Sequence, residues 1–273
     1  MSSPSDYLEA VGLGALQGVA EFLPVSSSGH LVIARAVLGE FGRTVEPEAN
    51  RLLVVVLHLG TLASILWAYR RDLWALARDP HYATCVCVAT VPLVAVGLSP
   101  LKDRLEENFE RPDVAGACLL LTAALLLAGQ WLAGRRRESA VRQARDVTVP
   151  SAAAIGLFQC VALLPGVSRS GSTIAGALVS GTGRAEAVRF SLMIGVPAIA
   201  GSGLLTAKDV WESGVELNAL PVGPLLTGAA VSFGVGVAAI SLLRKAVAQD
   251  RLHWFAAYCA AVGAATLVWR LSR

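Results

Sequence analysis

Charged residues are scarce in this sequence. They make up 16% of its 273 residues, whereas about 25% is usual in soluble proteins. The net charge of +3 is too small to indicate nucleic acid, so no such partner is expected. The five cysteines lack the spacing of a metal site and lie in apolar segments, and we interpret them as small hydrophobic residues. A secretory signal is not expected, because Asp6 and Glu9 stand where its basic residues would be.

Long apolar runs take the place of the missing charge. A helix needs roughly 20 apolar residues to cross the hydrocarbon core of a membrane. Six nearly charge-free segments approach or reach that length: 52–69, 82–98, 114–133, 190–205, 221–243 and 254–269. Six such segments are too many for the interior of a small soluble protein. The sequence therefore predicts an all-α polytopic membrane protein with six transmembrane helices.

Basic residues are concentrated in three of the loops between these segments. The basic loops are 70–81, 134–146 and 244–253, whereas 39–50, 101–113 and 207–220 have few basic residues or an excess of acidic ones. Loops rich in Lys and Arg usually remain in the cytoplasm, so the first three are predicted to be cytoplasmic. The last three transmembrane helices then run in the opposite directions to the first three, which indicates an inverted repeat.

A shorter stretch interrupted by Ser, Gly and Pro precedes each set of three helices, at 8–38 and 147–182. The two stretches match at an offset of 142 residues, as from Gln17 to Gln159, and both contain Ser-x-Ser-Gly. Irregular backbone at membrane depth is tolerated only when protein buries it or it lines a wet cavity. We therefore expect two re-entrant helix hairpins that enter from opposite sides of the membrane.

The repeat predicts a single integral membrane domain, 1–273, with a first repeat at 1–133 and a second at 147–273. Substrate sites in inverted-repeat membrane proteins lie near the midplane, where interrupted helices meet. The hairpin tips at 26–30 and 168–172 are therefore expected to face each other.

The predicted tips carry groups that suit an anion. Helix N-termini offer free N–H groups and a partial positive charge. Arg169 adds a rigid, permanently charged guanidinium that suits phosphate, and an arginine at the midplane is a functional hypothesis by default. Serine is a preferred N-cap, and each tip offers two candidates: Ser26 or Ser28, and Ser168 or Ser170.

Titratable and nucleophilic groups accompany the first tip. Gln17 and Glu21 are four residues apart, so they project from one face of a helix. Glu21 can bind a divalent cation, hold a proton acceptor in place, or balance the charge of a structural Arg169. His30, at the start of the next helix, can act as nucleophile or base when neutral, and Ser27 is the alternative nucleophile. The remaining histidines are interpreted as structural or interfacial: His58, His81 and His253.

Three motifs resemble those of the undecaprenyl-pyrophosphate phosphatase family, also called the bacitracin-resistance type. They are Gln17-x-x-x-Glu21, Pro24-Val-Ser-Ser-Ser-Gly-His30 and Pro165-Gly-Val-Ser-Arg-Ser-Gly171. The resemblance covers essentially the whole chain. It implies a multi-pass inner-membrane enzyme that hydrolyses undecaprenyl pyrophosphate to the monophosphate and so recycles the lipid carrier for cell-wall synthesis. It further implies an active site open to the outer, periplasmic face, a Mg²⁺ or Ca²⁺ cofactor, and a homodimer.

The resemblance also assigns roles to single positions. Catalytic roles fall on Glu21, Ser27, His30 and Arg169, and Glu21 is also the expected metal ligand. Substrate-binding roles fall on Gln17, Ser26, Ser28, Gly29, Ser168, Ser170 and Gly171. One departure matters, because the first position of the acidic motif is often Glu and here is Gln17. An amide cannot act as a base and is a weaker metal ligand, so Glu21 alone carries any carboxylate chemistry.

Two other functions compete with this prediction. Inverted repeats with broken helices are typical of secondary transporters, so the same pocket could move a polyisoprenyl phosphate across the membrane without hydrolysing it. The type 2 phosphatidic-acid phosphatases share Ser-Gly-His and Ser-Arg, but they need a second His and an Asp after the Arg. The stretch 170–182 contains neither residue, so this second alternative is disfavoured.

Overall fold

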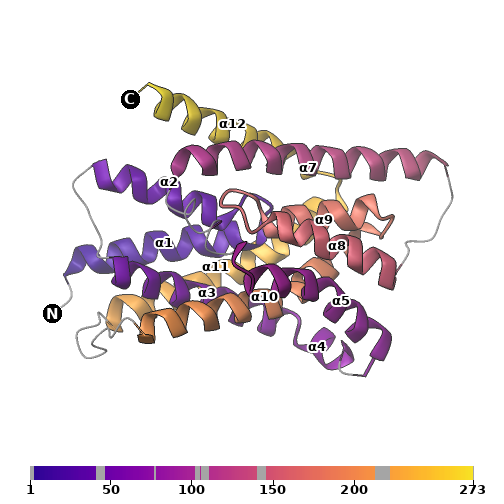
Figure 1. Ribbon diagram of the computed structural model, residues 1–273, viewed down its shortest axis with the longest axis horizontal. Helices are drawn as coiled ribbons and strands as arrows, with labels where there is room; N and C mark the ends of the chain where they lie inside the picture. Colours follow the sequence, from indigo (N-terminus) through magenta and orange to yellow (C-terminus); the bar gives the residue numbers. More distant parts are fainter. Residues whose placement is uncertain are drawn as a thin grey trace.

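The computed structural model describes residues 3–40, 47–76, 78–101, 105, 111–139, 146–212 and 222–272. Helices dominate these residues, and the elements run along one long axis (Figure 1). Their bounds are α1 Pro4–Phe22, α2 Ser27–Glu40, α3 Pro47–Ala68, α4 Arg70–Leu76, α5 Pro80–Gly97, α7 Pro112–Ser139, α8 Val149–Val161, α9 Arg169–Val179, α10 Arg184–Glu212, α11 Val222–Ala248 and α12 Leu252–Leu271.

Five of these helices are long and apolar enough to cross a membrane: α5, α7, α10, α11 and α12. The pair α3 and α4 makes a sixth candidate when it is counted as one span, bent by 75°. Apart from Tyr69, Leu98 and residue 221, which is not among the described residues, the six predicted apolar segments fall within these helices. The prediction of an all-α polytopic membrane protein is therefore confirmed.

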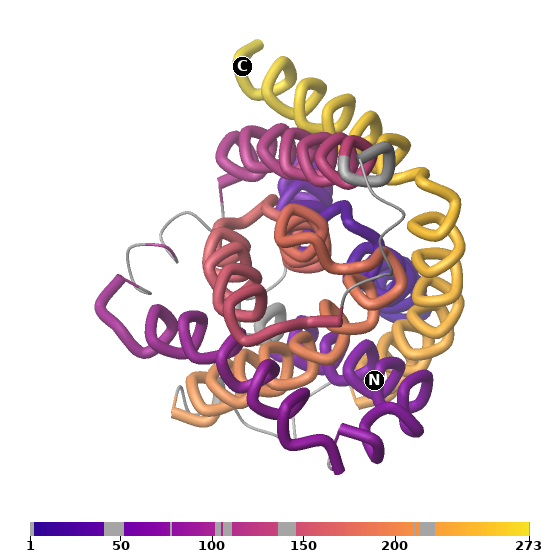
Figure 2. Tube along the Cα trace, turned by 90° about the vertical axis from the view of Figure 1, so that its right-hand side faces the viewer, coloured from indigo at the N-terminus to yellow at the C-terminus, as the bar shows by residue number. Residues whose placement is uncertain are grey.

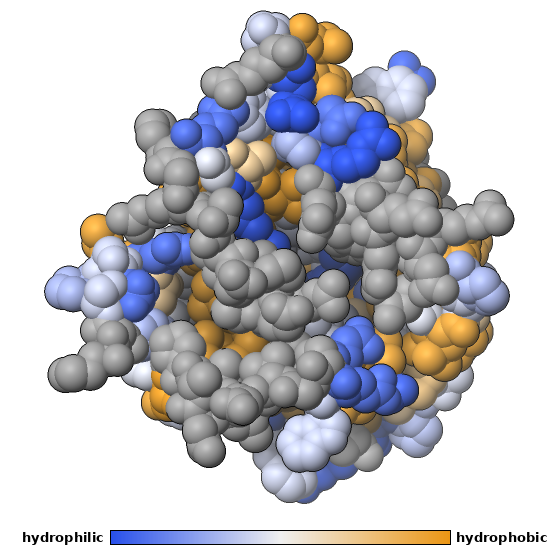
Figure 3. Space-filling model, turned by 60° about the vertical axis from the view of Figure 1, so that its left-hand side comes forward, coloured by the Kyte–Doolittle hydropathy of each residue, from blue (hydrophilic) through white to orange (hydrophobic). Residues whose placement is uncertain are grey.

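The outer surface of the bundle is apolar, as lipid contact requires. Leu226 is 64% exposed and Val268 is 67% exposed, although both lie within long apolar helices, and Leu157 of the shorter apolar helix α8 is 64% exposed. Figure 3 shows apolar side chains on the flank of the molecule and polar ones gathered on the end that faces forward. Many large apolar side chains are exposed in this way on the membrane-spanning helices, which fits contact with lipid.

Two short hairpins enter this bundle from its opposite ends. In Figure 1, α1 and α2 open toward the left and α8 and α9 toward the right, and their turns lie near the middle. The chain cannot continue as a helix through Pro24 or Pro165, which lie in these turns. Almost all of α9 is buried, and longer helices surround the hairpins in the end-on view of Figure 2.

Small residues let each hairpin approach a helix of the other half of the chain. A Cβ on Gly14 of α1 would lie 2.5 Å from the carbonyl oxygen of Gly228 in α11. A Cβ on Gly156 of α8 would lie 2.8 Å from the carbonyl oxygen of Ala89 in α5. Close backbone contact through small residues is how membrane helices commonly associate. Gly14 and Gly156 are separated by the same 142 residues as Gln17 and Gln159, so the two hairpins are held in equivalent ways.

Polar contacts gather the three basic loops at one end of the molecule. Asp72 forms an ion pair with Arg189 at 2.8 Å, and Asp250 forms one with Arg184 at 2.6 Å. Both arginines lie at the start of α10. The ring Nε2 of His81 lies 3.2 Å from the carbonyl oxygen of Val147. The described parts of loops 70–81, 134–146 and 244–253 therefore share one end. The following residues of the predicted loops lie outside the described part of the chain: 41–46, 77, 102–104, 106–110, 140–145 and 213–220.

Candidate active site

Ser26 organises the first tip. Its φ of 72° lies in the left-handed region, which non-glycine residues seldom adopt. Its Oγ accepts the backbone N–H of Gly29 at 3.3 Å and lies 3.3 Å from the Oγ of Ser28. Ser26 is therefore the residue that caps α2, and Ser28 lies inside the first turn. A strained residue of this kind costs free energy and is typical of functional sites.

Ser168 organises the second tip in the same pattern. Its Oγ accepts the backbone N–H of Gly171 at 3.0 Å and lies 3.1 Å from the Oγ of Ser170. Thr122 of α7 fixes this turn, since its Oγ1 donates to the Gly166 carbonyl at 2.9 Å and accepts the Ser168 N–H at 3.0 Å. Ser168 rather than Ser170 therefore caps α9. Two serines and one glycine therefore make the same hydrogen-bond pattern in both tips, at the offset of 142: Ser26, Ser28 and Gly29 in the first, and Ser168, Ser170 and Gly171 in the second.

The two tips touch, as the sequence predicts. The Oγ of Ser170 donates to the carbonyl of Leu23 at 3.3 Å, across the interface between the hairpins. A Cβ on Gly29 would lie only 2.7 Å from the Cα of Gly166. Glycine at both positions thus allows the two turns to meet backbone to backbone near the centre of the bundle.

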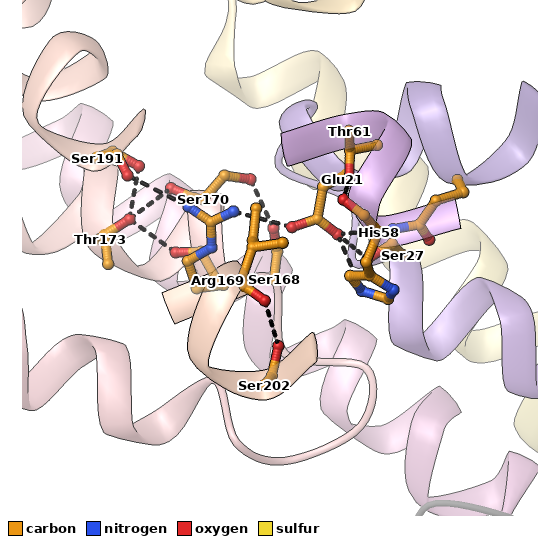
Figure 4. Close-up of polar contacts among 12 residues, drawn as sticks. Glu21, Ser27, His58, Thr61, Ser168, Arg169, Ser170, Thr173, Ser191 and Ser202 are labelled. Carbon is orange, nitrogen blue, oxygen red and sulfur yellow. Dashed lines mark hydrogen bonds and ion pairs between the residues drawn. The ribbon is translucent and has the colours of Figure 1, made fainter. Parts of the chain in front are cut away.

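Glu21 is the point on which the polar side chains converge (Figure 4). Arg169 donates from Nη2 to Oε1 at 2.9 Å. Ser27 donates from Oγ to Oε2 at 2.6 Å, and Gln17 donates from Nε2 to the same oxygen at 3.1 Å. The Nε2 of His58 lies 3.7 Å from Oε2. Glu21 is only 8% exposed, so its charge is balanced by these contacts rather than by bulk water.

Residues of α10 hold Arg169 toward Glu21. Nη1 of Arg169 donates to the carbonyl of Ser191 at 3.2 Å. Thr173 lies between the two chain segments, with its Oγ1 2.7 Å from both the Arg169 carbonyl and the Ser191 hydroxyl. A side chain at Gly195 would clash with the guanidinium, so glycine there makes room for it. Sequence reasoning did not single out Thr173, Ser191 or Gly195.

His30 lies against Tyr258 and not against Glu21. Its Nδ1 donates to the Ser26 carbonyl at 2.7 Å, because a carbonyl only accepts. Nε2 then accepts from the hydroxyl of Tyr258 in α12 at 2.8 Å, and the two rings stack at 5.5 Å. The described contacts of Glu21 lead to Gln17, Ser27, His58 and Arg169. They do not include the contact between Glu21 and His30 that the sequence-based mechanism considered.

His58 is a site residue that the sequence analysis interpreted as structural or interfacial. It lies in α3, within the apolar segment 52–69, and the structure places it beside Glu21. An ionisable residue inside a transmembrane segment is by default a functional hypothesis. That argument singled out Arg169, and applied to His58 it would have found this residue too. Tyr258 carried no comparable signal, since tyrosine is common in membrane helices near an interface.

The donor atoms around Glu21 bear on the expected cation. Within the described residues, no group of three or more His, Cys, Asp or Glu side chains could hold a metal ion. The Oε1 atom of Gln17 is buried and has no hydrogen-bond partner, although its Nε2 is bonded to Glu21. One carboxylate and one free amide oxygen suit a cation that also takes oxygens from a phosphate group, as Mg²⁺ usually does.

Comparison with known proteins places the chain in a family. The family model described as "Bacitracin resistance protein BacA" matches residues 10–265, which include both tips. The chain belongs to the BacA family. A BacA-family relative from Rhodopirellula baltica, named undecaprenyl-diphosphatase, is 39% identical and covers 94% of this chain and 96% of its own. Relatives of the same name from Desulfatibacillum aliphaticivorans and Christiangramia forsetii are 37% and 34% identical, each covering at least 96% of both chains.

Proposed function

We propose that this chain is an undecaprenyl-diphosphatase, which releases inorganic phosphate from a polyisoprenyl diphosphate and leaves the monophosphate. The observation that carries the proposal is the contact between two hairpin tips, where Arg169, Ser27 and two helix N-termini surround Glu21. The full-length similarity to relatives of that name supports the same reaction.

The tips supply what a diphosphate needs for binding. The N-termini of α2 and α9 present backbone N–H groups and a partial positive charge to an anion. Arg169 uses two of its nitrogens for Glu21 and Ser191, and its guanidinium offers five N–H donors in all. We propose that the remaining donors and the tip hydroxyls bind phosphate oxygens: Ser26, Ser28, Ser168 and Ser170.

The geometry favours Ser27 over His30 as the nucleophile. Ser27 donates its proton toward the Oε2 of Glu21 at 2.6 Å, the arrangement of a hydroxyl and its general base. Both ring nitrogens of His30 are engaged by Ser26 and Tyr258. We propose that His30 positions the strained Ser26 turn while Ser27 performs the attack.

The proposed reaction has two steps. Ser27 Oγ forms a bond to the terminal phosphorus, the bond from that phosphorus to the bridging oxygen breaks, and the proton of Ser27 passes to Glu21. The polyisoprenyl monophosphate leaves with the bridging oxygen. Water then attacks the phosphorus of the phosphoserine, the bond from that phosphorus to Ser27 Oγ breaks, and Glu21 returns its proton to Ser27 Oγ. Inorganic phosphate departs with the oxygen of the water, and one proton of that water passes to solvent. Arg169 and the helix N-termini stabilise negative charge on the transferred phosphoryl group, which is where most phosphoryl-transfer catalysis arises.

A divalent cation, Mg²⁺ or Ca²⁺, is proposed as a cofactor that arrives with the substrate. Glu21 and the free amide oxygen of Gln17 would hold it together with phosphate oxygens. When bound, it would neutralise charge on the diphosphate.

The proposed architecture is an inverted repeat of 1–133 and 147–273, with six transmembrane helices and two re-entrant hairpins. Three observations support it: the opposite entry of the hairpins, the matching serine caps, and the equivalent packing of Gly14 and Gly156. We further propose an inner-membrane location with the active site open to the outer face. A homodimer, as the family resemblance implies, is tested by light scattering on the detergent-solubilised protein.

The decisive experiment measures phosphate release from undecaprenyl or farnesyl diphosphate by purified protein in detergent. We expect turnover by the wild-type protein and a loss of about 10²-fold or more in Arg169→Ala, since one charge-stabilising donor is typically worth that much. A protein that only moved the lipid across the membrane would release no phosphate, and that result would overturn the proposal.

A further inference from the structure

Tyr258 of α12 contacts the first tip, yet neither the family resemblance nor the mechanism above gives it a role. Its hydroxyl lies 2.8 Å from Nε2 of His30, and the planes of the two rings differ by only 8°. The adjacent Cys259 donates from Sγ to the carbonyl of Pro24 at 3.6 Å. Two successive residues of α12 therefore reach the turn that leads to the N-cap Ser26.

The direction of the hydrogen bond between Tyr258 and His30 follows from the other ring nitrogen. Nδ1 of His30 lies 2.7 Å from the carbonyl oxygen of Ser26, and a carbonyl only accepts, so Nδ1 carries the ring proton. In the neutral ring, Nε2 then has a lone pair and accepts from the tyrosine hydroxyl. His30 is only 9% exposed, so Tyr258 satisfies a buried nitrogen and holds the ring in the orientation that donates to Ser26.

The Ser26 carbonyl belongs to the peptide bond that leads into Ser27. A peptide bond is planar, so the direction of this carbonyl sets the position from which Ser27 begins. The carbonyl accepts both the backbone N–H of His30 at 3.2 Å and the ring N–H at 2.7 Å. Ser26 itself has a φ of 72°, a strained value that persists only where the surroundings determine it. The His30 ring is one of the groups that determine it.

Helix α12 is in turn fixed to the helix that holds the second tip. Helices α7 and α12 lie side by side (Figure 1), and a Cβ on Gly263 of α12 would lie 2.6 Å from the carbonyl oxygen of Gly116 in α7. Thr122 of α7 accepts the backbone N–H of Ser168 in the second tip at 3.0 Å. The pair α7 and α12 therefore contacts both tips and holds them in register.

We propose that Tyr258 is a positioning residue that acts on Ser27 through His30. The inference rests on the proposed phosphatase function. The Tyr258 hydroxyl holds the His30 ring, and the ring holds the Ser26 carbonyl. That carbonyl fixes the peptide from which Ser27 reaches Glu21 at 2.6 Å. The role is geometric, and it supports the alignment on which phosphoryl transfer depends.

A single hydroxyl can be removed to test this role. Tyr258→Phe keeps the ring, and Tyr7→Phe is the matched control, since Tyr7 is similarly exposed (41% against 46%) and lies near the start of α1, away from the tips. We expect Tyr258→Phe to lower the kcat of phosphate release about 10- to 100-fold, as loss of a supporting contact does. KM should change by less than about threefold. The control should keep wild-type kcat.

The variant His30→Asn separates positioning from other roles of the ring. The side-chain amide nitrogen of asparagine takes the place of Nδ1 and can donate to the Ser26 carbonyl without help from Tyr258. We expect His30→Asn to keep a kcat at least about tenfold higher than that of His30→Ala. In the His30→Asn background, Tyr258→Phe should change kcat by less than about twofold, because residues that act through one another have non-additive effects.

Size-exclusion profiles and melting curves in detergent show whether each variant is folded. Should Tyr258→Phe lose its fold, the comparison of His30→Asn with His30→Ala decides, because it tests the contact with the Ser26 carbonyl on which the proposal depends. Equal kcat values in these two folded variants would show that His30 does not act by holding that carbonyl, and the proposal would fail.

Two further results would overturn the proposal. One is a folded Tyr258→Phe whose kcat is within about twofold of wild type or above it. The other is a full loss from Tyr258→Phe in the His30→Asn background, which would show that the hydroxyl acts elsewhere. These results presuppose that the wild-type protein releases phosphate. Failure of the wild-type protein to do so would instead refute the proposed function, so the two failures are distinguishable.

Discussion

At the scale of single residues, Ser27 makes the sharpest prediction. Its Oγ lies 2.6 Å from Glu21 Oε2, so its loss should remove both the nucleophile and the hydrogen bond. We expect Ser27→Ala to reduce turnover by about 10³-fold or more, a loss typical of removing a nucleophile. Rapid acid quenching with terminally labelled diphosphate should trap a phosphoserine at position 27 in the wild-type protein. Ser241→Ala, an exposed hydroxyl of α11, is the matched control and should keep normal activity.

Gln17 makes a second residue-scale prediction, which concerns the cation. Gln17→Glu replaces the free amide oxygen with a carboxylate that can ligate a divalent ion. We expect the concentration of Mg²⁺ or Ca²⁺ that gives half-maximal phosphate release, measured after treatment with EDTA, to fall several-fold. An unchanged cation requirement in an active Gln17→Glu variant would argue against a cation beside Glu21.

The site residues show what sequence could and could not supply. Glu21 and Arg169 lie 148 residues apart, yet the repeated Ser-x-Ser-Gly was enough to predict that they meet. The sequence marks His58 as an ionisable residue in a transmembrane segment, but it does not show which histidine lies beside Glu21, because that depends on how α3 and α12 pack around the first tip. Tyr258 of α12 engages His30, while α3 brings His58 to the carboxylate. The closeness of His30 to Glu21 along the chain therefore does not show which histidine lies beside the carboxylate.

At the scale of elements, the contact between α1 and α11 can be tested at a single glycine. A Cβ on Gly14 would lie 2.5 Å from the Gly228 carbonyl oxygen, whereas nothing lies within 4 Å of a Cβ on Gly12. We expect Gly14→Ala to destabilise the protein by about 1–3 kcal/mol or more, as overpacking does. Gly12→Ala should be neutral or slightly stabilising, because alanine favours a helix. Thermal unfolding in detergent measures both, and equal melting temperatures would contradict the packing described.

Element boundaries were predicted less well than the elements themselves. His30 was expected at the start of the second helix of the first hairpin, but α2 begins at Ser27, and α9 of the second hairpin begins at Arg169. The helices begin earlier because Ser26 and Ser168 are the N-caps, and not Ser28 and Ser170. A left-handed residue would be expected at a glycine, and Ser26 instead adopts φ 72° because the surrounding hydrogen bonds compensate the strain. The predicted loop 70–81 also contains α4, a short helix that follows the 75° bend after α3.

At the scale of the whole molecule, hydropathy predicted where the membrane-spanning helices lie along the chain. Each predicted apolar segment corresponds to a candidate span, with α3 and α4 counted as one, because covering the hydrocarbon core demands uninterrupted apolar length. The distribution of arginine predicted which loops share an end, and the contacts of Asp72, His81 and Asp250 bear that out. Hydropathy could not show how the hairpins pack, since small-residue contacts such as Gly14 with Gly228 are not marked by apolarity.

Three arginine–tryptophan pairs lie at the same end of the molecule, whereas a fourth, Arg270 with Trp269, lies at the opposite end of α12. Trp67, Trp131 and Trp254 each lie under an arginine side chain, at 4.9, 3.9 and 4.5 Å from the guanidinium carbon to the ring centroid. Such pairs suit the boundary between lipid headgroups and the hydrocarbon core, where tryptophan and basic residues gather. Because the positive-inside rule counts the same arginines, this end should face the cytoplasm and the opposite end, with the opening of α1 and α2, should face outward.

This orientation can be tested with single cysteines in a variant whose five native cysteines are replaced. Arg78→Cys lies between α4 and α5 at the arginine-rich end, and Arg111→Cys lies before α7 at the other. A membrane-impermeant maleimide applied to intact spheroplasts should label position 111 and spare position 78 until the membrane is permeabilised. Labelling of position 78 alone in intact cells would reverse the topology. The first tip would then open to the cytoplasm, and a diphosphate released at the outer surface could not reach Ser27 through the opening of α1 and α2.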